Sequence, residues 1–115
     1  MIHWKELKTA EQLSRLLLNS KNFPVVIFKH STRCATSSVA LSRIERDWND
    51  DAREIQFYYL DVIACRELSL QVAETLGIAH QSPQLLLVRN GKCIYDASHL
   101  FISMEAAMRH LKQAA

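Results

Sequence analysis

One stretch of the sequence, residues 24–38, constrains the fold of this chain more than any other. Its apolar run at 25–28 predicts a buried strand, small polar residues follow, and the stretch then reaches a single cysteine, Cys34. The residues after Cys34 carry apolar side chains at helical spacing, so the cysteine is placed at a helix N-terminus. There the unpaired backbone N–H groups and the helix dipole stabilise a negative charge. The position therefore suits a reactive thiolate, although a small residue that merely starts a helix is the alternative.

Length, charge and cysteine usage limit what the chain can be. Its 115 residues predict one domain, residues 1–115, and its net charge of +2 comes from basic residues interleaved with acidic ones, not from a nucleic-acid-binding stripe. No apolar run is long enough to span a membrane and the N-terminal residues lack a signal-peptide region, so we expect no membrane partner and a cytoplasmic location. The three cysteines have neither disulfide-framework nor zinc spacing, so we expect no metal.

The rest of the sequence alternates helical and extended patterns. Thr9 and Gln12 fit a capping box, Gly77 suits a left-handed helix end, and Asn90-Gly91 is a strong hairpin signal. The predicted order is helix, strand, helix, strand, helix, strand, strand, helix. A helical crossover favours parallel pairing of the first two strands, and the hairpin is antiparallel. We therefore predict an α/β fold with a mixed four-stranded sheet flanked by helices.

This order of elements, with Cys34 between the first strand and its helix, resembles the thioredoxin fold. In that fold a cis-proline precedes the strand that opens the terminal hairpin, and it faces the reactive cysteine. Pro83 stands at the corresponding place here, so the resemblance implies an uncommon cis bond between Ser82 and Pro83. It also implies that backbone groups of Ser82 pair with a substrate chain. A trans proline at the first residue of a strand is the alternative.

A set of short motifs resembles the monothiol bacilliredoxin family, small thioredoxin-like proteins that act on bacillithiol mixed disulfides. The set spans the chain and comprises Lys29-His30-Ser31-Thr32-Arg33-Cys34, Asp61-Val62-Ile63, His80-Gln81-Ser82-Pro83-Gln84, Asn90-Gly91-Lys92 and Ala97-Ser98-His99. The family commonly has Thr-Cys-Pro-Ile-Ser at its active site, whereas this chain has Arg33-Cys34-Ala35-Thr36-Ser37. The cysteine and the serine three residues on are retained. The missing threonine and proline bear on substrate preference more than on the basic activity.

The resemblance implies a monothiol thiol–disulfide oxidoreductase of the stress response, with Cys34 as its nucleophile. Ser37 occupies the place of the second cysteine in dithiol enzymes, where a hydroxyl cannot resolve a disulfide but can hydrogen-bond a thiolate. Bacillithiol is then a co-substrate and no cofactor is bound, and the partners are bacillithiolated client proteins. The residues that we expect to bind the substrate are Arg33, His80, Ser82 and Pro83.

The other cysteines and two histidines leave alternatives open. Cys65 follows the second strand at the sheet edge where Cys34 is expected, so it is either a resolving thiol or a half-buried helix-start residue. Cys93 lies in the outer hairpin strand and is expected to be structural. His30 and His80 either present an imidazole to the thiol pocket or are ordinary loop residues.

Two other functions compete with the bacillithiol-dependent one. The first is a glutaredoxin-like enzyme that uses glutathione or another low-molecular-weight thiol. The second is a thioredoxin-fold binding module whose cysteine is not catalytic, and the reactivity of Cys34 would distinguish it from either enzyme. The motifs of cluster-binding glutaredoxins, Cys-Gly-Phe-Ser and Thr-Val-Pro, are missing from the sequence, which disfavours an iron–sulfur cluster.

Overall fold

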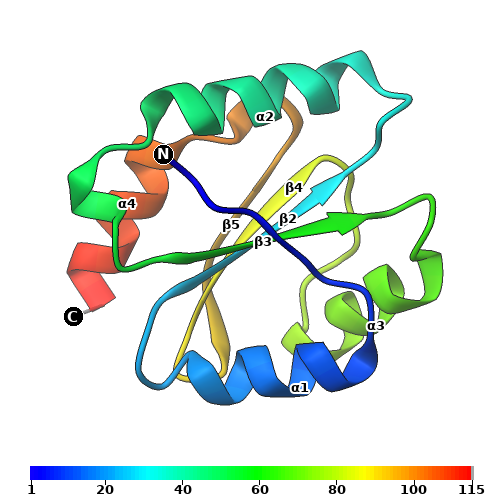
Figure 1. The fold of residues 1–115 in the computed structure, drawn as a ribbon, viewed down its shortest axis with the longest axis horizontal. Coiled ribbons are helices and arrows are strands. Elements are labelled where there is room, and N and C mark those ends of the chain that lie inside the picture. The colour runs from blue at the N-terminus through cyan, green and yellow to red at the C-terminus, as the bar shows by residue number, and fades with distance from the viewer. Residues whose placement is uncertain (115) are drawn as a thin grey trace.

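A five-stranded mixed sheet with helices on both faces makes up the fold, in a computed structural model that describes residues 1–114 (Figure 1). The sheet order is β1-β3-β2-β4-β5, with β1, β3 and β2 mutually parallel and β4 antiparallel to both β2 and β5. The elements are β1 (Lys5–Glu6), α1 (Ala10–Asn19), β2 (Val25–His30), α2 (Ala35–Asp47), η1 (Asp50–Ala52), β3 (Gln56–Asp61), α3 (Arg66–Leu76), β4 (Gln84–Arg89), β5 (Lys92–Ser98), η2 (His99–Phe101) and α4 (Met104–Ala114).

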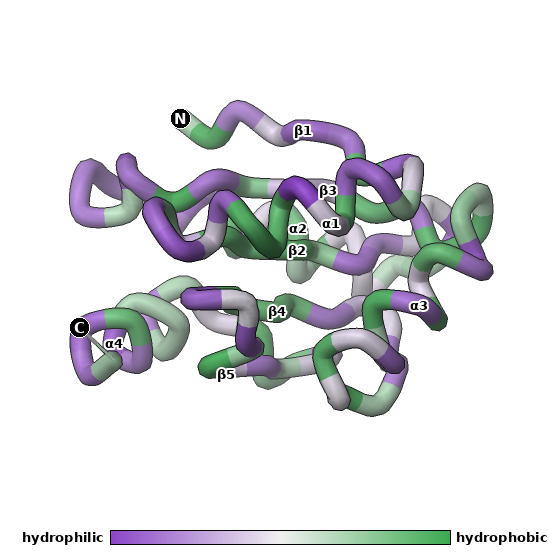
Figure 2. The backbone as a smooth tube through the Cα atoms, turned by 90° about the horizontal axis from the view of Figure 1, so that it is seen from below, coloured by the Kyte–Doolittle hydropathy of each residue, from purple (hydrophilic) through white to green (hydrophobic). Residues whose placement is uncertain are grey.

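The sheet has five strands, so the predicted number of four is wrong. The additional strand β1 has only two residues, both exposed, and it pairs in parallel with β3 along the edge seen in Figure 2. Two residues are too few for the alternation of apolar and polar side chains that identifies a strand in a sequence. The α/β class, the parallel crossover and the antiparallel hairpin are confirmed.

Strand β2 lies in the middle of the sheet, and all six of its residues are buried because helices cover both faces. Phe28 packs in the layer that includes residues of α2 and α4, and Ile27 packs in the layer that includes residues of α1 and α3. The same alternation carries two polar side chains into the interior. The His30 side chain contacts α2 and the Lys29 side chain contacts α3. The last two residues of β2 therefore supply one buried polar group to each face of the sheet.

Local signals in the sequence match the elements that they border. The side chain of Thr9 accepts a hydrogen bond from the Gln12 backbone N–H, and the Gln12 side chain accepts one from the Thr9 N–H, which completes the predicted capping box. Gly77 ends α3 with φ +70°. Asn90 and Gly91 both have positive φ, as a two-residue hairpin turn requires.

The loops that follow β2 and β3 and the loop that precedes β4 lie at one end of the sheet (Figure 1). Backbone hydrogen bonds tie this end together. The Val62 N–H donates to the His30 carbonyl oxygen at 3.0 Å, and the His99 N–H donates to the Pro83 carbonyl oxygen at 3.1 Å. Segments far apart in the sequence thus form one continuous edge around the Cys34 loop.

Candidate active site at the Cys34 loop

Cys34 is held at the start of α2 by a tight turn. Its N–H donates to the Ser31 carbonyl oxygen at 3.2 Å, which closes the turn between β2 and the helix. Cys34 is the N-cap residue, its backbone is extended, and its side chain makes no capping hydrogen bond. The thiol is partly exposed. The N–H groups of the first helical turn are therefore available to a negative charge on the Cys34 sulfur.

Ser37 lies one turn into α2 and is completely buried. Its hydroxyl oxygen accepts a hydrogen bond from the Ser31 N–H at 3.0 Å and lies 2.5 Å from Nδ1 of His30. We expected this hydroxyl to face the Cys34 thiol, but the partners that it has in the structure are His30 and Ser31. The hydroxyl thus fixes the turn that carries Cys34, because the carbonyl oxygen of Ser31 also accepts a hydrogen bond from the Cys34 N–H.

His30 is the buried residue that holds this loop from below, through its contact with the Ser37 hydroxyl. Its side chain is buried against the rings of Phe28 and Tyr59, with ring centroids 5.6 and 5.3 Å away. Burial lowers the pKa of His30, and the nearby Asp61 carboxylate opposes that effect only in part. The Nδ1 atom of a neutral imidazole can accept a hydrogen bond from the Ser37 hydroxyl, while the Ser37 oxygen accepts one from the Ser31 N–H.

The Ser82–Pro83 peptide bond is cis, and Pro83 is buried at the start of β4. Because Gln84 pairs with Lys29 in the antiparallel register, this loop lies beside the last residues of β2. The Ser82 hydroxyl is buried and has no hydrogen-bond partner within residues 1–114. His99, for which the sequence suggested no role, donates its backbone N–H to the Pro83 carbonyl oxygen.

A buried polar cluster on the other face of β2 joins His80, a predicted substrate-binding residue, to Lys29 and Ser69, two partners that the sequence analysis missed. The Lys29 ammonium is fully buried and donates to the Ser69 carbonyl oxygen at 2.9 Å and to Nδ1 of His80 at 3.0 Å. The Ser69 hydroxyl also lies 3.2 Å from this nitrogen. Burial lowers the pKa of Lys29 to about 8. Burial, followed by the charges of Lys29 and Arg66, lowers the pKa of His80.

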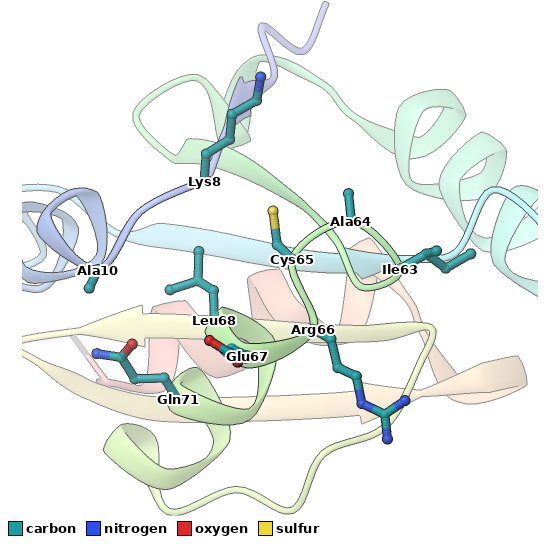
Figure 3. A pocket seen from close by; sticks show the side chains of 9 residues that line it. All are labelled: Lys8, Ala10, Ile63, Ala64, Cys65, Arg66, Glu67, Leu68 and Gln71. Atoms are coloured by element: carbon teal, nitrogen blue, oxygen red, sulfur yellow. The ribbon is translucent and has the colours of Figure 1, made fainter.

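Arg33 and Cys65, two other predicted site residues, have different settings. Arg33 is exposed in the turn just before Cys34. Cys65 begins α3 and borders a hollow of about 460 Å³, where its sulfur points toward Lys8 and away from Arg66 (Figure 3). This hollow is lined by the N-terminal segment and α3 and does not include Cys34. A resolving role for Cys65 stays a prediction, and no contact with the Cys34 loop supports it.

Cys93 differs from both other cysteines. Its thiol donates to the Tyr95 carbonyl oxygen at 3.3 Å within β5. Burial raises the pKa of Cys93 to about 11, so very little thiolate forms at neutral pH. This setting agrees with a structural role.

Residues 1–114 contain no group of three or more His, Cys, Asp or Glu residues placed to hold a metal ion. Within the same residues, no helix combines the length and the apolar composition needed to cross a bilayer.

A partly exposed cysteine that follows the central strand at a helix N-terminus, together with a cis-proline just before the strand that pairs with that central strand, defines the thioredoxin class of thiol redox proteins. The comparison with protein families is more specific. The family model of the monothiol bacilliredoxin BrxC matches residues 5–107, and the chain belongs to this family.

Solved structures with the same fold have low sequence identity to the chain. A candidate oxidoreductase with a thioredoxin fold is 24% identical, with a TM-score of 0.80, and the match covers 94% of this chain and 93% of that one. Thioredoxin from Malassezia sympodialis is 18% identical, with a TM-score of 0.73 and coverage of 100% and 94%. Thioredoxin from Trypanosoma brucei brucei is 13% identical, with a TM-score of 0.75 and coverage of 97% and 90%. These likenesses establish the fold.

Proposed function

We propose that this protein is a monothiol oxidoreductase that removes bacillithiol from mixed disulfides on client proteins, with Cys34 as the nucleophile. One observation carries the proposal: Cys34 stands at the N-terminus of α2, and the buried position one turn on holds a hydroxyl, Ser37, instead of a second thiol. Membership of the monothiol bacilliredoxin family supports bacillithiol as the co-substrate. The three free cysteines fit a reducing cytoplasm.

The reaction consists of two thiol–disulfide exchanges. The Cys34 thiolate attacks the bacillithiol sulfur of the mixed disulfide, a new disulfide forms between Cys34 and bacillithiol, and the client cysteine leaves as a thiolate that takes a proton from water. A second bacillithiol thiolate then attacks the bacillithiol sulfur of this adduct and releases Cys34 as a thiolate. The client is reduced, the bacillithiol removed from it leaves joined to the attacking bacillithiol as bacillithiol disulfide, and the protein returns to its starting state.

The residues around Cys34 serve these steps without taking part in bond exchange. The first-turn N–H groups of α2 stabilise the Cys34 thiolate both before attack and after release. Ser37 and His30 hold the turn in which the thiol sits. We expect the backbone of Ser82, next to the cis bond to Pro83, to pair with an extended client segment, and we expect the exposed Arg33, which precedes Cys34, to add positive charge to the substrate-binding surface.

Intact-mass spectrometry after one turnover with a bacillithiolated client tests this route. Wild-type protein and the Cys65→Ser variant should both carry one bacillithiol on Cys34, and Cys34→Ser should carry none and release no client. A wild-type product two hydrogens lighter than the reduced protein, lost in Cys65→Ser, would show an internal Cys34–Cys65 disulfide and refute the monothiol route. The same client carrying glutathione provides the comparison for the choice of thiol, and equal rates would refute bacillithiol specificity.

A further inference from the structure

A hollow of about 370 Å³ flanks the Cys34 edge on the α3 side of the sheet. It is lined by Val62, Ile63, Arg66, Ser69, Leu70 and His80. Two links connect it to the active-site loops. The Val62 N–H is bonded to the carbonyl oxygen of His30 at the end of β2, and His80 belongs to the loop that leads to Pro83. The hollow and Cys34 therefore lie at the same end of the sheet.

Arg66 is the charged residue among those that line this hollow. The Arg66 side chain is exposed and points away from the Cys65 sulfur (Figure 3), and it is close enough to His80 for its charge to lower the pKa of that imidazole. The buried Lys29 ammonium donates hydrogen bonds to Ser69 and His80, which both line the hollow. No carboxylate is among the lining residues.

His80 offers a hydrogen-bond donor of fixed identity. Both the Lys29 ammonium and the Ser69 hydroxyl lie within hydrogen-bond distance of Nδ1. An ammonium can only donate, so Nδ1 is the acceptor and the ring proton sits on Nε2. The Arg66 guanidinium and the His80 N–H donor at the hollow, with the charge of the buried Lys29 behind His80, form an array that matches a carboxylate.

We propose that this hollow binds a carboxylate of the low-molecular-weight thiol while the sulfur of that thiol is joined to Cys34. Bacillithiol ends in a malate group with two carboxylates, which the Arg66 guanidinium can bind in bidentate fashion with the Nε2–H of His80 alongside. A molecule the size of an extended tripeptide spans about 10 Å, and the hollow and the Cys34 loop lie at the same end of the sheet. The inference rests on the proposed function and names the part of the substrate that the protein recognises.

The test compares two mixed disulfides on one client cysteine, the first with bacillithiol and the second with 2-mercaptoethanol, which has no carboxylate. We expect Arg66→Gln to lower kcat/KM about tenfold for the bacillithiol substrate, mainly through KM, and to leave the 2-mercaptoethanol substrate unchanged. Arg66→Lys should keep part of the activity because it keeps the charge. Arg15→Gln, an exposed position on α1, is the matched control for loss of one charge and should behave like wild type.

An NMR titration with L-malate separates failure of this inference from failure of the proposed function. Malate should shift the backbone resonance of Arg66 and the ring resonances of His80 in wild-type protein, and dimethyl malate, which has no charge, should not. Absence of malate-specific shifts would overturn the inference even if the enzyme is active. Equal slowing of both client substrates by Arg66→Gln would also overturn it, because the hollow would then bind the client. If neither substrate is turned over by wild type, the proposed function fails, and the malate titration still decides the subsite.

Discussion

Lys29 is the residue whose setting departs most from ordinary protein chemistry. It is a fully buried amine whose two hydrogen-bond partners, Ser69 and His80, are both uncharged. Within residues 1–114 it belongs to none of the ion pairs, which all lie between exposed side chains. An unpaired ammonium in the interior costs stability, and its retention beside the Arg66–His80 hollow fits a role in presenting positive charge to a ligand.

This setting predicts a specific dependence of stability on pH. Burial lowers the pKa of Lys29 from 10.5 to about 8, so between these values the unfolded chain binds a proton that the folded chain has released. The free energy of unfolding therefore rises with pH across that window. The destabilisation caused by burying the ammonium is fully present below pH 8. Between pH 8 and 9.5 the gain should be about 1.5 kcal/mol.

Urea denaturation gives the free energy of unfolding of wild type and of Lys29→Met at pH 8 and at pH 9.5. The change between the two pH values in wild type, minus the same change in Lys29→Met, measures the gain due to Lys29. The comparison is needed because the raised pKa values of Cys93, Tyr58, Tyr59 and Tyr95 make stability fall with rising pH in both proteins. Parallel pH profiles for wild type and variant would contradict a lowered pKa at Lys29.

The three cysteines should differ in their reaction with iodoacetamide at neutral pH. Cys34 should react first because it is the proposed nucleophile and is partly exposed at the N-terminus of α2, and Cys93 should react last because burial raises its pKa to about 11. Peptide mapping after brief alkylation gives the order. Faster modification of Cys65 than of Cys34 would mean that the nucleophile has been wrongly assigned.

At the scale of elements, the junction of β2 and α2 is built around the Ser37 hydroxyl. It joins the helix to the Ser31 N–H and to His30, and Ser31 in turn accepts the Cys34 N–H. Ser37→Ala leaves two buried polar groups without their partner. We expect it to lower the free energy of unfolding by about 1–3 kcal/mol, measured by urea denaturation. An unchanged stability would show that water replaces the hydroxyl.

A thiol at position 37 should change the chemistry of this junction. The N-cap residue Cys34 and position 37 are neighbours at the first turn of α2, so a thiol at position 37 that rotates away from His30 can meet the Cys34 sulfur, and Ser37→Cys should convert the product from a bacillithiol adduct into an internal disulfide with Cys34, two hydrogens lighter than the reduced protein. Thr36→Cys is the matched control, since residues two apart do not face each other, and it should keep the adduct. An adduct that persists in Ser37→Cys would mean that the buried position cannot reach the Cys34 sulfur.

The elements that carry the site were predictable where their signals are local. The passage from an apolar strand through Cys34 into a helix and the proline before β4 each depend on neighbouring residues. The cluster around Lys29 was not predictable from the sequence, because the hydrogen-bond partners of Lys29, Ser69 and His80, lie 40 and 51 residues away in the sequence. One signal pointed to it: a lysine that continues an apolar strand must find buried hydrogen-bond acceptors.

Across the whole molecule, the buried residues that stabilise the fold lie in the middle of the strands, and the residues proposed to react lie in loops at the strand ends. The centre of the sheet is β2, covered on both faces and flanked by β3 and β4, and the apolar layers above and below it include residues of all four helices. The reactive edge consists of loops joined by single backbone hydrogen bonds. Loops of this kind can adapt to a client or an adduct while the strands beneath them stay in place.

This separation predicts the pattern of amide hydrogen exchange. Amides of β2 should exchange roughly a hundredfold or more slowly than those of residues 31–34, because buried central strands open only with the whole fold, whereas exposed loops open locally. The edge strand β1, which has two exposed residues and a partner on one side only, should exchange faster than any other strand. Exchange followed by NMR in reduced protein and in the Cys34–bacillithiol adduct should differ at the loops around Cys34 and Pro83 and agree along β2. Adduct formation that alters exchange throughout β2 would contradict a rigid sheet beneath an adaptable edge.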